Sequence, residues 1–173
     1  MRPSGRFLNR LDLLGITFGA GFFHDGTQVL YKAIAILITP NDPFRQSLKK
    51  ILMNRFPFID IQEASDGTEG MDKVNTFDPN LIFLEIHLPA QSGLDLARRI
   101  KSDHPAIVIV ILISYDLPEY QTAAQESRVE HLVPKDEWTG VDMIDLVQLI
   151  LSDQDIDKHE GWPAEKNSNE DCP

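Results

Sequence analysis

Residues Leu81–Gly93, with the sequence L-I-F-L-E-I-H-L-P-A-Q-S-G, decide the fold. The four apolar residues Leu81–Leu84 show no alternation, which predicts a strand buried on both faces. A single carboxylate, Glu85, follows them, and Pro89 and Gly93 then break the segment. In an open parallel sheet, the carboxyl ends of the strands border the crevice where ligands bind. We therefore expect Glu85 to lie at a functional site rather than in the core.

On both sides of this stretch, predicted strands alternate with predicted helices. Apolar runs indicate strands at 33–38, 58–64, 81–85, 107–113 and 131–133, and apolar residues at helical spacing indicate helices at 42–56, 66–77, from Gly93, 118–127 and 142–151. These βα units predict an α/β fold, a doubly wound (βα)5 flavodoxin-like parallel sheet with strand order 2-1-3-4-5. That order places the turn at Thr39 and Pro40 beside Glu85.

The two ends of the chain differ from this central part. Residues 1–32 combine three arginines with a short apolar stretch. No typical cleavage site follows, and the apolar stretch is too short to span a bilayer. We therefore expect a mobile extension and no membrane contact. Residues 152–173 are polar, acidic and aperiodic, which is typical of a disordered tail. The expected organisation is therefore 1–32 extension, 33–151 domain and 152–173 tail.

Composition narrows the function further. The 173 residues carry a net charge of −11, which would repel a phosphate backbone, so we expect no nucleic-acid binding. The lone cysteine, Cys172, can form no internal disulfide, and this fits a cytoplasmic location. The histidines have no metal-ligand spacing, and no glycine-rich phosphate motif is present.

Several blocks of the sequence resemble the receiver domain of two-component response regulators, most closely the branch that carries a C-terminal helix-turn-helix. The blocks are I-L-I-T-P-N-D-P-F-R, E-A-S-D-G, F-D-P-N-L-I-F-L-E, L-P-A-Q-S-G-L-D-L, Y-D-L-P-E-Y and K-D. The resemblance implies a domain that accepts a phosphoryl group from a histidine kinase onto an aspartate, with Mg²⁺, and then changes the surface formed by its fourth helix, fifth strand and fifth helix. Only an acidic tail follows residue 151, so we expect no DNA-binding helix-turn-helix.

The positions that carry the family's chemistry are mostly altered. Glu85 stands at the phospho-acceptor position, Ile113 replaces the hydroxyl residue that contacts the phosphoryl group, and Leu132 replaces the aromatic switch residue. Ser114 is adjacent to Ile113 but should point to the opposite face of its strand. Lys135 alone is retained, so the expected pocket consists of Glu85, Thr39, Pro40, Ile113, Ser114 and Lys135.

The metal ligands are altered too. Thr39 and Pro40 stand where the family has two acidic residues, and neither suits Mg²⁺. A one-residue slip could bring Asp42 back as a ligand, but the ungapped match favours Asp42 as an outward helix cap. We therefore expect no metal and no other cofactor, with Mg²⁺ required only in the alternative below.

These changes predict a pseudo-receiver rather than an enzyme: a protein-interaction module that works without phosphorylation. Its partner would be another signalling protein, a histidine kinase or a regulator, bound through residues 118–151, and homodimerisation by that surface stays open. A Glu85–Lys135 pair would either imitate a phosphorylated aspartate or simply neutralise an unused pocket. The alternative is a working receiver that accepts phosphate on Glu85 or Asp42 with Mg²⁺. A small-molecule site in the same crevice is a third hypothesis.

Overall fold

The computed structural model describes residues 33–115 and 117–157. Its main sheet has five parallel strands in the order β2-β1-β3-β6-β7, which confirms the predicted fold. The strands are β1 (Ala33–Ile38), β2 (Ile59–Ala64), β3 (Leu81–Glu85), β6 (Val108–Ile113) and β7 (His131–Pro134). A short antiparallel hairpin of β4 (His87–Leu88) and β5 (Gln91–Ser92) follows β3 and was not predicted.

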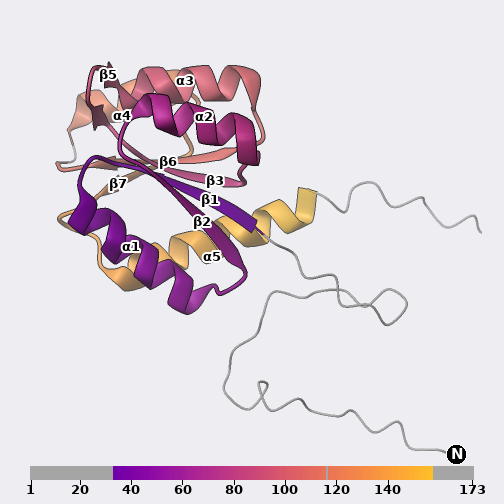
Figure 1. Cartoon of the computed structure of the whole chain (residues 1–173). Coiled ribbons are helices and arrows are strands. Elements are labelled where there is room, and N and C mark those ends of the chain that lie inside the picture. Colours follow the sequence, from indigo (N-terminus) through magenta and orange to yellow (C-terminus); the bar gives the residue numbers. More distant parts are fainter. Residues whose placement is uncertain (1–32, 116, 158–173) are drawn as a thin grey trace, which may run out of the picture.

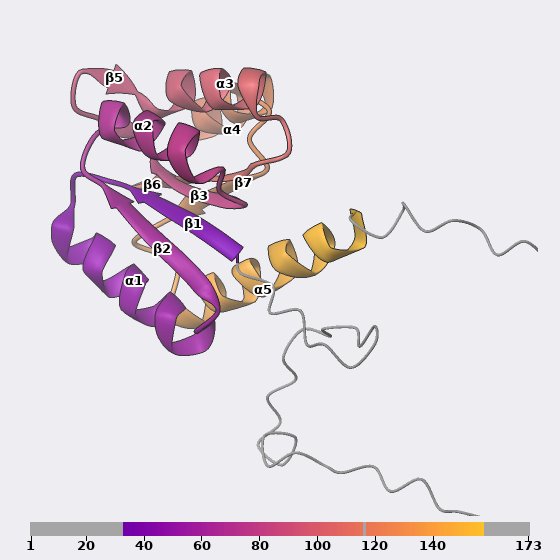
Figure 2. The same ribbon diagram turned by 45° about the vertical axis from the view of Figure 1, so that its right-hand side comes forward.

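Helices cover both faces of the sheet (Figure 1). They are α1 (Asp42–Arg55), α2 (Gly67–Phe77), α3 (Gly93–Asp103), α4 (Pro118–Glu126) and α5 (Gly140–Asp157). Figures 1 and 2 show α1 and α5 together on one face, and α2, α3 and α4 on the other. Each face has its own apolar core, because the central strands are buried on both sides, as their unbroken apolar sequence predicted.

Local signals explain where the helices begin. The side chain of Asp66 caps α2 by accepting hydrogen bonds from the amides of Thr68 and Glu69, each at 2.9 Å. In α1 the cap is Asn41, whose side-chain oxygen accepts from the amide of Phe44 at 3.1 Å. The prediction that Asp42 caps this helix is therefore wrong by one residue, and Asp42 is the first residue of the helix.

The carboxyl-terminal boundary also differs from the prediction. Helix α5 does not end at Leu151 but continues to Asp157, so the predicted start of the tail falls inside the helix. The predicted extension 1–32 and the tail from residue 158 onward lie outside the described residues. Within the described ranges, no helix is both long enough and apolar enough to cross a membrane.

Asn80 joins three strands at the end of the sheet opposite to the predicted site. Its amide and side-chain oxygen bond to the carbonyl and amide of Ile34, and its carbonyl accepts from the amide of Val108 at 3.1 Å. Asn80 thus links β1, β3 and β6 at the amino end of β3, and Glu85 lies at the opposite, carboxyl end of this strand.

Candidate functional site

Glu85, the last residue of β3, lies in a buried ion pair. The residue is only 5% exposed, and both carboxylate oxygens accept hydrogen bonds from Nζ of Lys135 at 2.8 Å. Lys135 directly follows β7, and its amide donates to the carbonyl of Ile113 at 2.8 Å, which fixes its backbone beside β6. One anion and one cation therefore face each other at the carboxyl end of the sheet, shielded from water.

Thr39 provides a third contact to this pair. Its side chain is fully buried, and its hydroxyl donates to Oε2 of Glu85 at 3.1 Å. The hydroxyl oxygen of Thr39 in turn accepts a hydrogen bond from the amide of Asn41 at 3.2 Å, which ties the turn after β1 to the site. From the sequence, Thr39 was expected in the pocket beside Glu85 as a residue unsuited to bind Mg²⁺, and its role as a hydrogen-bond donor was not foreseen. Pro40, its neighbour in the turn, is exposed.

Two further residues that sequence reasoning did not assign to the site support it from α1. The ring of Phe44 lies 5.5 Å from Nζ of Lys135, within the range of a cation–π contact. Arg45 donates to the carbonyl of Thr39 at 2.5 Å and so holds the turn in place. The sequence shows only that Phe44 belongs to the apolar face of its helix, and no local pattern links it to a distant lysine.

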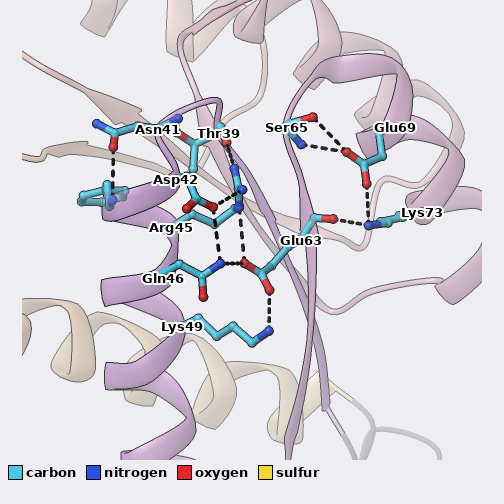
Figure 3. Close-up of polar contacts among 11 residues, drawn as sticks. Thr39, Asn41, Asp42, Arg45, Gln46, Lys49, Glu63, Ser65, Glu69 and Lys73 are labelled. Carbon is cyan, nitrogen blue, oxygen red and sulfur yellow. Dashed lines mark hydrogen bonds and ion pairs between the residues drawn. The ribbon is translucent and has the colours of Figure 1, made fainter.

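Figure 3 shows that Arg45 also belongs to a charged cluster between α1 and β2. Glu63 accepts hydrogen bonds from Arg45, Gln46 and Lys49. Burial alone would raise the pKa of Glu63, but the hydrogen bond from Lys49 and the charges of Lys49 and Arg45 outweigh it, so the pKa lies below its ordinary value. The cluster therefore keeps Glu63 ionised and Arg45 fixed under the turn.

Asp42 belongs to this cluster rather than to the Glu85 pair. Its Oδ1 accepts from Arg45 at 2.5 Å, and its side chain is 64% exposed (Figure 3). The prediction that this carboxylate points outward agrees with the geometry, although the residue does not cap the helix.

Among the described residues, the other predicted site residues make no side-chain hydrogen bond to the Glu85 carboxylate. The side chain of Ile113 is fully buried in the core beneath α2, α3 and α4. Ser114 is half-buried and, within the described part of the chain, makes no hydrogen bond to Glu85. Leu132 is also half-buried and packs against the same core as Ile113. The structure thus brings together Glu85, Lys135 and Thr39, and leaves the others at its border.

The donor set around Glu85 does not fit a magnesium ion. Mg²⁺ requires near-octahedral oxygen coordination, usually with one or two carboxylates, and Glu85 already gives both oxygens to a lysine. Across residues 33–115 and 117–157, no three His, Cys, Asp or Glu side chains are close enough together to hold a metal. A cation entering here would have to displace an ammonium group that is already paired.

A parallel sheet in this order, with an acidic residue at the end of β3 and a lysine directly after β7, is a CheY-like α/β fold. Residues 36–151 match the family described as response regulator receiver domain, and the chain belongs to this family. Receiver domains act through contacts with other signalling proteins.

Comparison with individual proteins supports the same family. The chain is 31% identical over 90 residues to a protein-glutamate methylesterase/protein-glutamine glutaminase of Hahella chejuensis, covering 52% of this chain and 26% of that protein. It is 24% identical over 87 residues to the transcriptional regulatory protein DegU of Brevibacillus brevis, covering 50% of this chain and 37% of that protein. The chain therefore spans only a minor part of these relatives.

Solved structures show the same fold. A CheY-like receiver domain protein from Methanospirillum hungatei superposes with a TM-score of 0.68 at 17% identity, covering 73% of this chain and 99% of that one. A LuxR-family DNA-binding response regulator from Staphylococcus aureus gives a TM-score of 0.63 at 20% identity, covering 68% and 98%. At these identities the likeness concerns the fold alone.

Proposed function

We propose that this receiver domain is a protein-interaction module that works without phosphorylation and without metal. The observation that carries the proposal is the contact of Lys135 with both oxygens of Glu85, completed by the Thr39 hydroxyl. An oxygen that attacks phosphorus in line must be free and correctly placed, and a misplacement of about 1 Å costs on the order of 100-fold in rate. Glu85 is paired, one methylene longer than aspartate, and lacks acidic neighbours in the turn at Thr39 and Pro40.

The proposed binding surface comprises residues 118–151, which include α4, β7 and most of α5. Lys135 connects this surface to Glu85, because it immediately follows β7 and lies before α5. A pair that holds Lys135 permanently would hold this surface in one state. The partner would be another signalling protein, such as a histidine kinase or a second regulator, in the cytoplasm, and the domain itself would not be an enzyme.

Two meanings of the fixed pair can be separated by experiment. If Glu85 imitates a phosphorylated aspartate, Lys135→Met will shift the NMR amide signals of α4 and β7, because the surface leaves its fixed state. If the pair only neutralises a pocket, the shifts will stay within the loops after Leu84, Ile113 and Pro134. Lys101→Met, at another buried lysine with an acidic partner, is the matched control for general destabilisation.

The alternative is a working receiver that accepts phosphate on Glu85 or Asp42 with Mg²⁺. It has one observation in its favour, which is that Asp42 lies exposed beside the turn after β1. Acetyl phosphate with Mg²⁺, and separately beryllofluoride with Mg²⁺, tests both readings by intact mass and by amide shifts of the loops after Ile38, Leu84 and Ile113.

A variant with Thr39→Asp, Pro40→Asp and Glu85→Asp together is the positive control for this test, since it returns the acidic residues to the site. We expect the wild-type chain to show no mass gain and no saturable shift under conditions where this variant responds. A phosphoryl adduct on the wild-type chain would overturn the proposed function.

A further inference from the structure

The outward side of α5 bears a shallow hollow of about 340 Å³. Five residues line this hollow: Trp138, Asp142, Asp145, Leu146 and Leu149. Leu149 is 55% exposed, and Val141, one helical turn before Asp145, is 65% exposed. Exposed apolar side chains that gather in one place, with polar groups around them, are typical of a contact site.

The border of this hollow is acidic. Asp136 and Glu137 are exposed in the turn just before α5, and the helix itself contains no lysine or arginine. Asp142 accepts hydrogen bonds from the amide and hydroxyl of Thr139. Asp145 is exposed and, within the described part of the chain, makes no side-chain hydrogen bond or ion pair. The hollow therefore favours a ligand that is both basic and apolar.

Residues 1–32 of the same chain have the complementary composition. They contain four basic and two acidic residues, a net charge of +2, whereas residues 33–157 contain ten basic and 21 acidic residues, a net charge of −11. Arg6 and Arg10 are four positions apart. The apolar residues next to them recur at spacings of four, three and four: Phe7, Leu11, Leu14 and Phe18. On a helix, this spacing gives an apolar row with the two arginines along one side.

The described chain begins within reach of the hollow. Ala33, the first residue of β1, belongs to the same apolar core as Val147 and Ile150 on the inner side of α5. Figures 1 and 2 both show the start of β1 beside this helix. The 14 residues 19–32 can span about 46–50 Å when extended, and Asp142 to Leu149 covers only about 10 Å of helix. Chain length therefore does not limit contact between residues 6–18 and the hollow.

We propose that residues 6–18 bind, as a helix, in the hollow on α5 of the same chain. In this arrangement the two arginines face Asp145 and the acidic turn before α5, and the apolar row covers Trp138 and Leu149. The segment is tethered beside α5, which raises its effective concentration at the hollow. Contacts that would be weak between separate molecules are therefore sufficient here.

Charge selects this occupant over residues 158–173, which contain two basic and four acidic residues and would be repelled by the hollow. The hollow lies within the proposed binding surface of residues 118–151, so a partner that binds there would have to displace the segment. This regulatory consequence rests on the proposed function. The contact itself does not involve Glu85, so its failure is distinguishable from failure of the proposed function.

A nitroxide spin label in the full chain tests the contact. Cys172→Ser removes the only thiol, and Asn9→Cys then adds a label at a position opposite the apolar row. At low salt we expect this label to broaden the NMR amide signals of Asp145 and Leu149 and to spare those of α3, on the other face of the sheet (Figure 1). The wild-type chain labelled at Cys172 itself is the matched comparison and should leave the signals of the hollow sharp.

Charge reversal tests whether the arginines and Asp145 attract each other. The double variant Arg6→Glu with Arg10→Glu should lose the broadening, and so should Asp145→Lys, while all three changes together should restore it. Asp103→Lys, at an exposed aspartate of α3, is the matched control and should leave the broadening unchanged. Raising the salt concentration should reduce it, since the charges are at the surface.

Sharp α5 signals in the chain labelled at position 9 overturn the proposal and leave the hollow to a different protein. Broadening that persists in the charge-reversed variants, or that only the label at Cys172 produces, also overturns it. Mixing spin-labelled chain with isotope-enriched chain that has no label detects contacts between copies. Broadening in this mixture as strong as within one doubly labelled chain would show that the segment binds a second copy, which contradicts the contact proposed here.

Discussion

At the scale of single residues, the site is built around one carboxylate. Glu85, at the end of β3, accepts hydrogen bonds from Lys135 on both oxygens and from the Thr39 hydroxyl on one of them. A buried charge is stable only when it is paired and hydrogen-bonded. Glu85, Lys135 and Thr39 meet that condition with one another.

Removing the lysine should expose this dependence. In Lys135→Met the Glu85 carboxylate stays buried with only the Thr39 hydroxyl as donor, and we expect a loss of about 3–5 kcal/mol in the free energy of unfolding by urea at pH 7. The double variant Glu85→Gln with Lys135→Met should recover much of this loss, because no unpaired charge remains. Equal stability of Lys135→Met and the wild-type chain would show that the pair is not buried in solution.

The threonine hydroxyl should contribute less. Thr39→Val keeps the shape of the side chain but removes the hydrogen bonds to Glu85 and from Asn41, so we expect a loss of about 1–3 kcal/mol in the free energy of unfolding. Thr39→Ser keeps the hydroxyl and is the control for lost packing. The same urea titration measures both, and a valine variant as stable as the wild-type chain would contradict the assigned role.

How far the sequence predicts this site follows from the kind of information each residue carries. Glu85 and Lys135 were expected to pair because both match positions of the receiver-domain pattern that border the same crevice. The Thr39 hydroxyl and the Phe44 ring were not foreseen, since their partners lie far along the chain and only the tertiary packing brings them together. Nothing in the local sequence tells which way a threonine turns at the end of a strand.

At the scale of elements, polar side chains fix the junctions between strands and helices. After β2, Glu69 accepts hydrogen bonds from the amide and hydroxyl of Ser65, while Lys73 donates to Glu69 and to the carbonyl of Glu63 (Figure 3). The hydrogen bond from Lys73, followed by that from the Ser65 amide, lowers the pKa of Glu69 to about 2 from 4.5. Glu69 therefore links α2 to the end of β2.

This shift predicts a pH dependence of stability. A carboxylate whose pKa is lower in the folded chain stabilises it above the unfolded value of 4.5, and this contribution is lost as the pH falls toward 2. Because Glu69 is 44% exposed, solvent screening reduces the effect to about 1 kcal/mol or less. The difference in unfolding free energy between wild type and Glu69→Gln should shrink from pH 6 to pH 3. A constant difference would contradict the shifted pKa.

Element boundaries show where sequence patterns carry too little information. The β4–β5 hairpin has two residues per strand, too few for an alternating pattern, and its turn contains Ala90 with a φ of 65°. Helix α5 passes Leu151 because adding a residue to a formed helix costs little, even where the residue is polar. The strands and helices with long apolar patterns were predicted close to their observed bounds.

At the scale of the whole molecule, the site and the proposed binding surface share one sheet. Glu85 lies at the carboxyl end of its central strand β3, and the surface of residues 118–151 includes its outer strand β7. A change at Glu85 can therefore reach that surface through β6, which lies between β3 and β7 in the sheet.

Metal should leave the stability of the whole chain unchanged. A ligand that binds only the folded state raises the melting temperature as its concentration exceeds its dissociation constant. We expect millimolar Mg²⁺ to leave the thermal unfolding of the wild-type chain where it is, and to raise that of the variant with Thr39→Asp, Pro40→Asp and Glu85→Asp. A concentration-dependent rise in the wild-type chain alone would point to a magnesium site in it.

The full burial of Thr39 limits how this sequence can change over time. An aspartate introduced there alone would add a second anion beside Glu85 with a single lysine to balance both, and a buried like-charge pair lowers stability. The step to an acidic residue at position 39 would thus pass through a less stable protein unless other substitutions accompany it. Selection for folding stability alone would therefore keep a residue without charge at position 39.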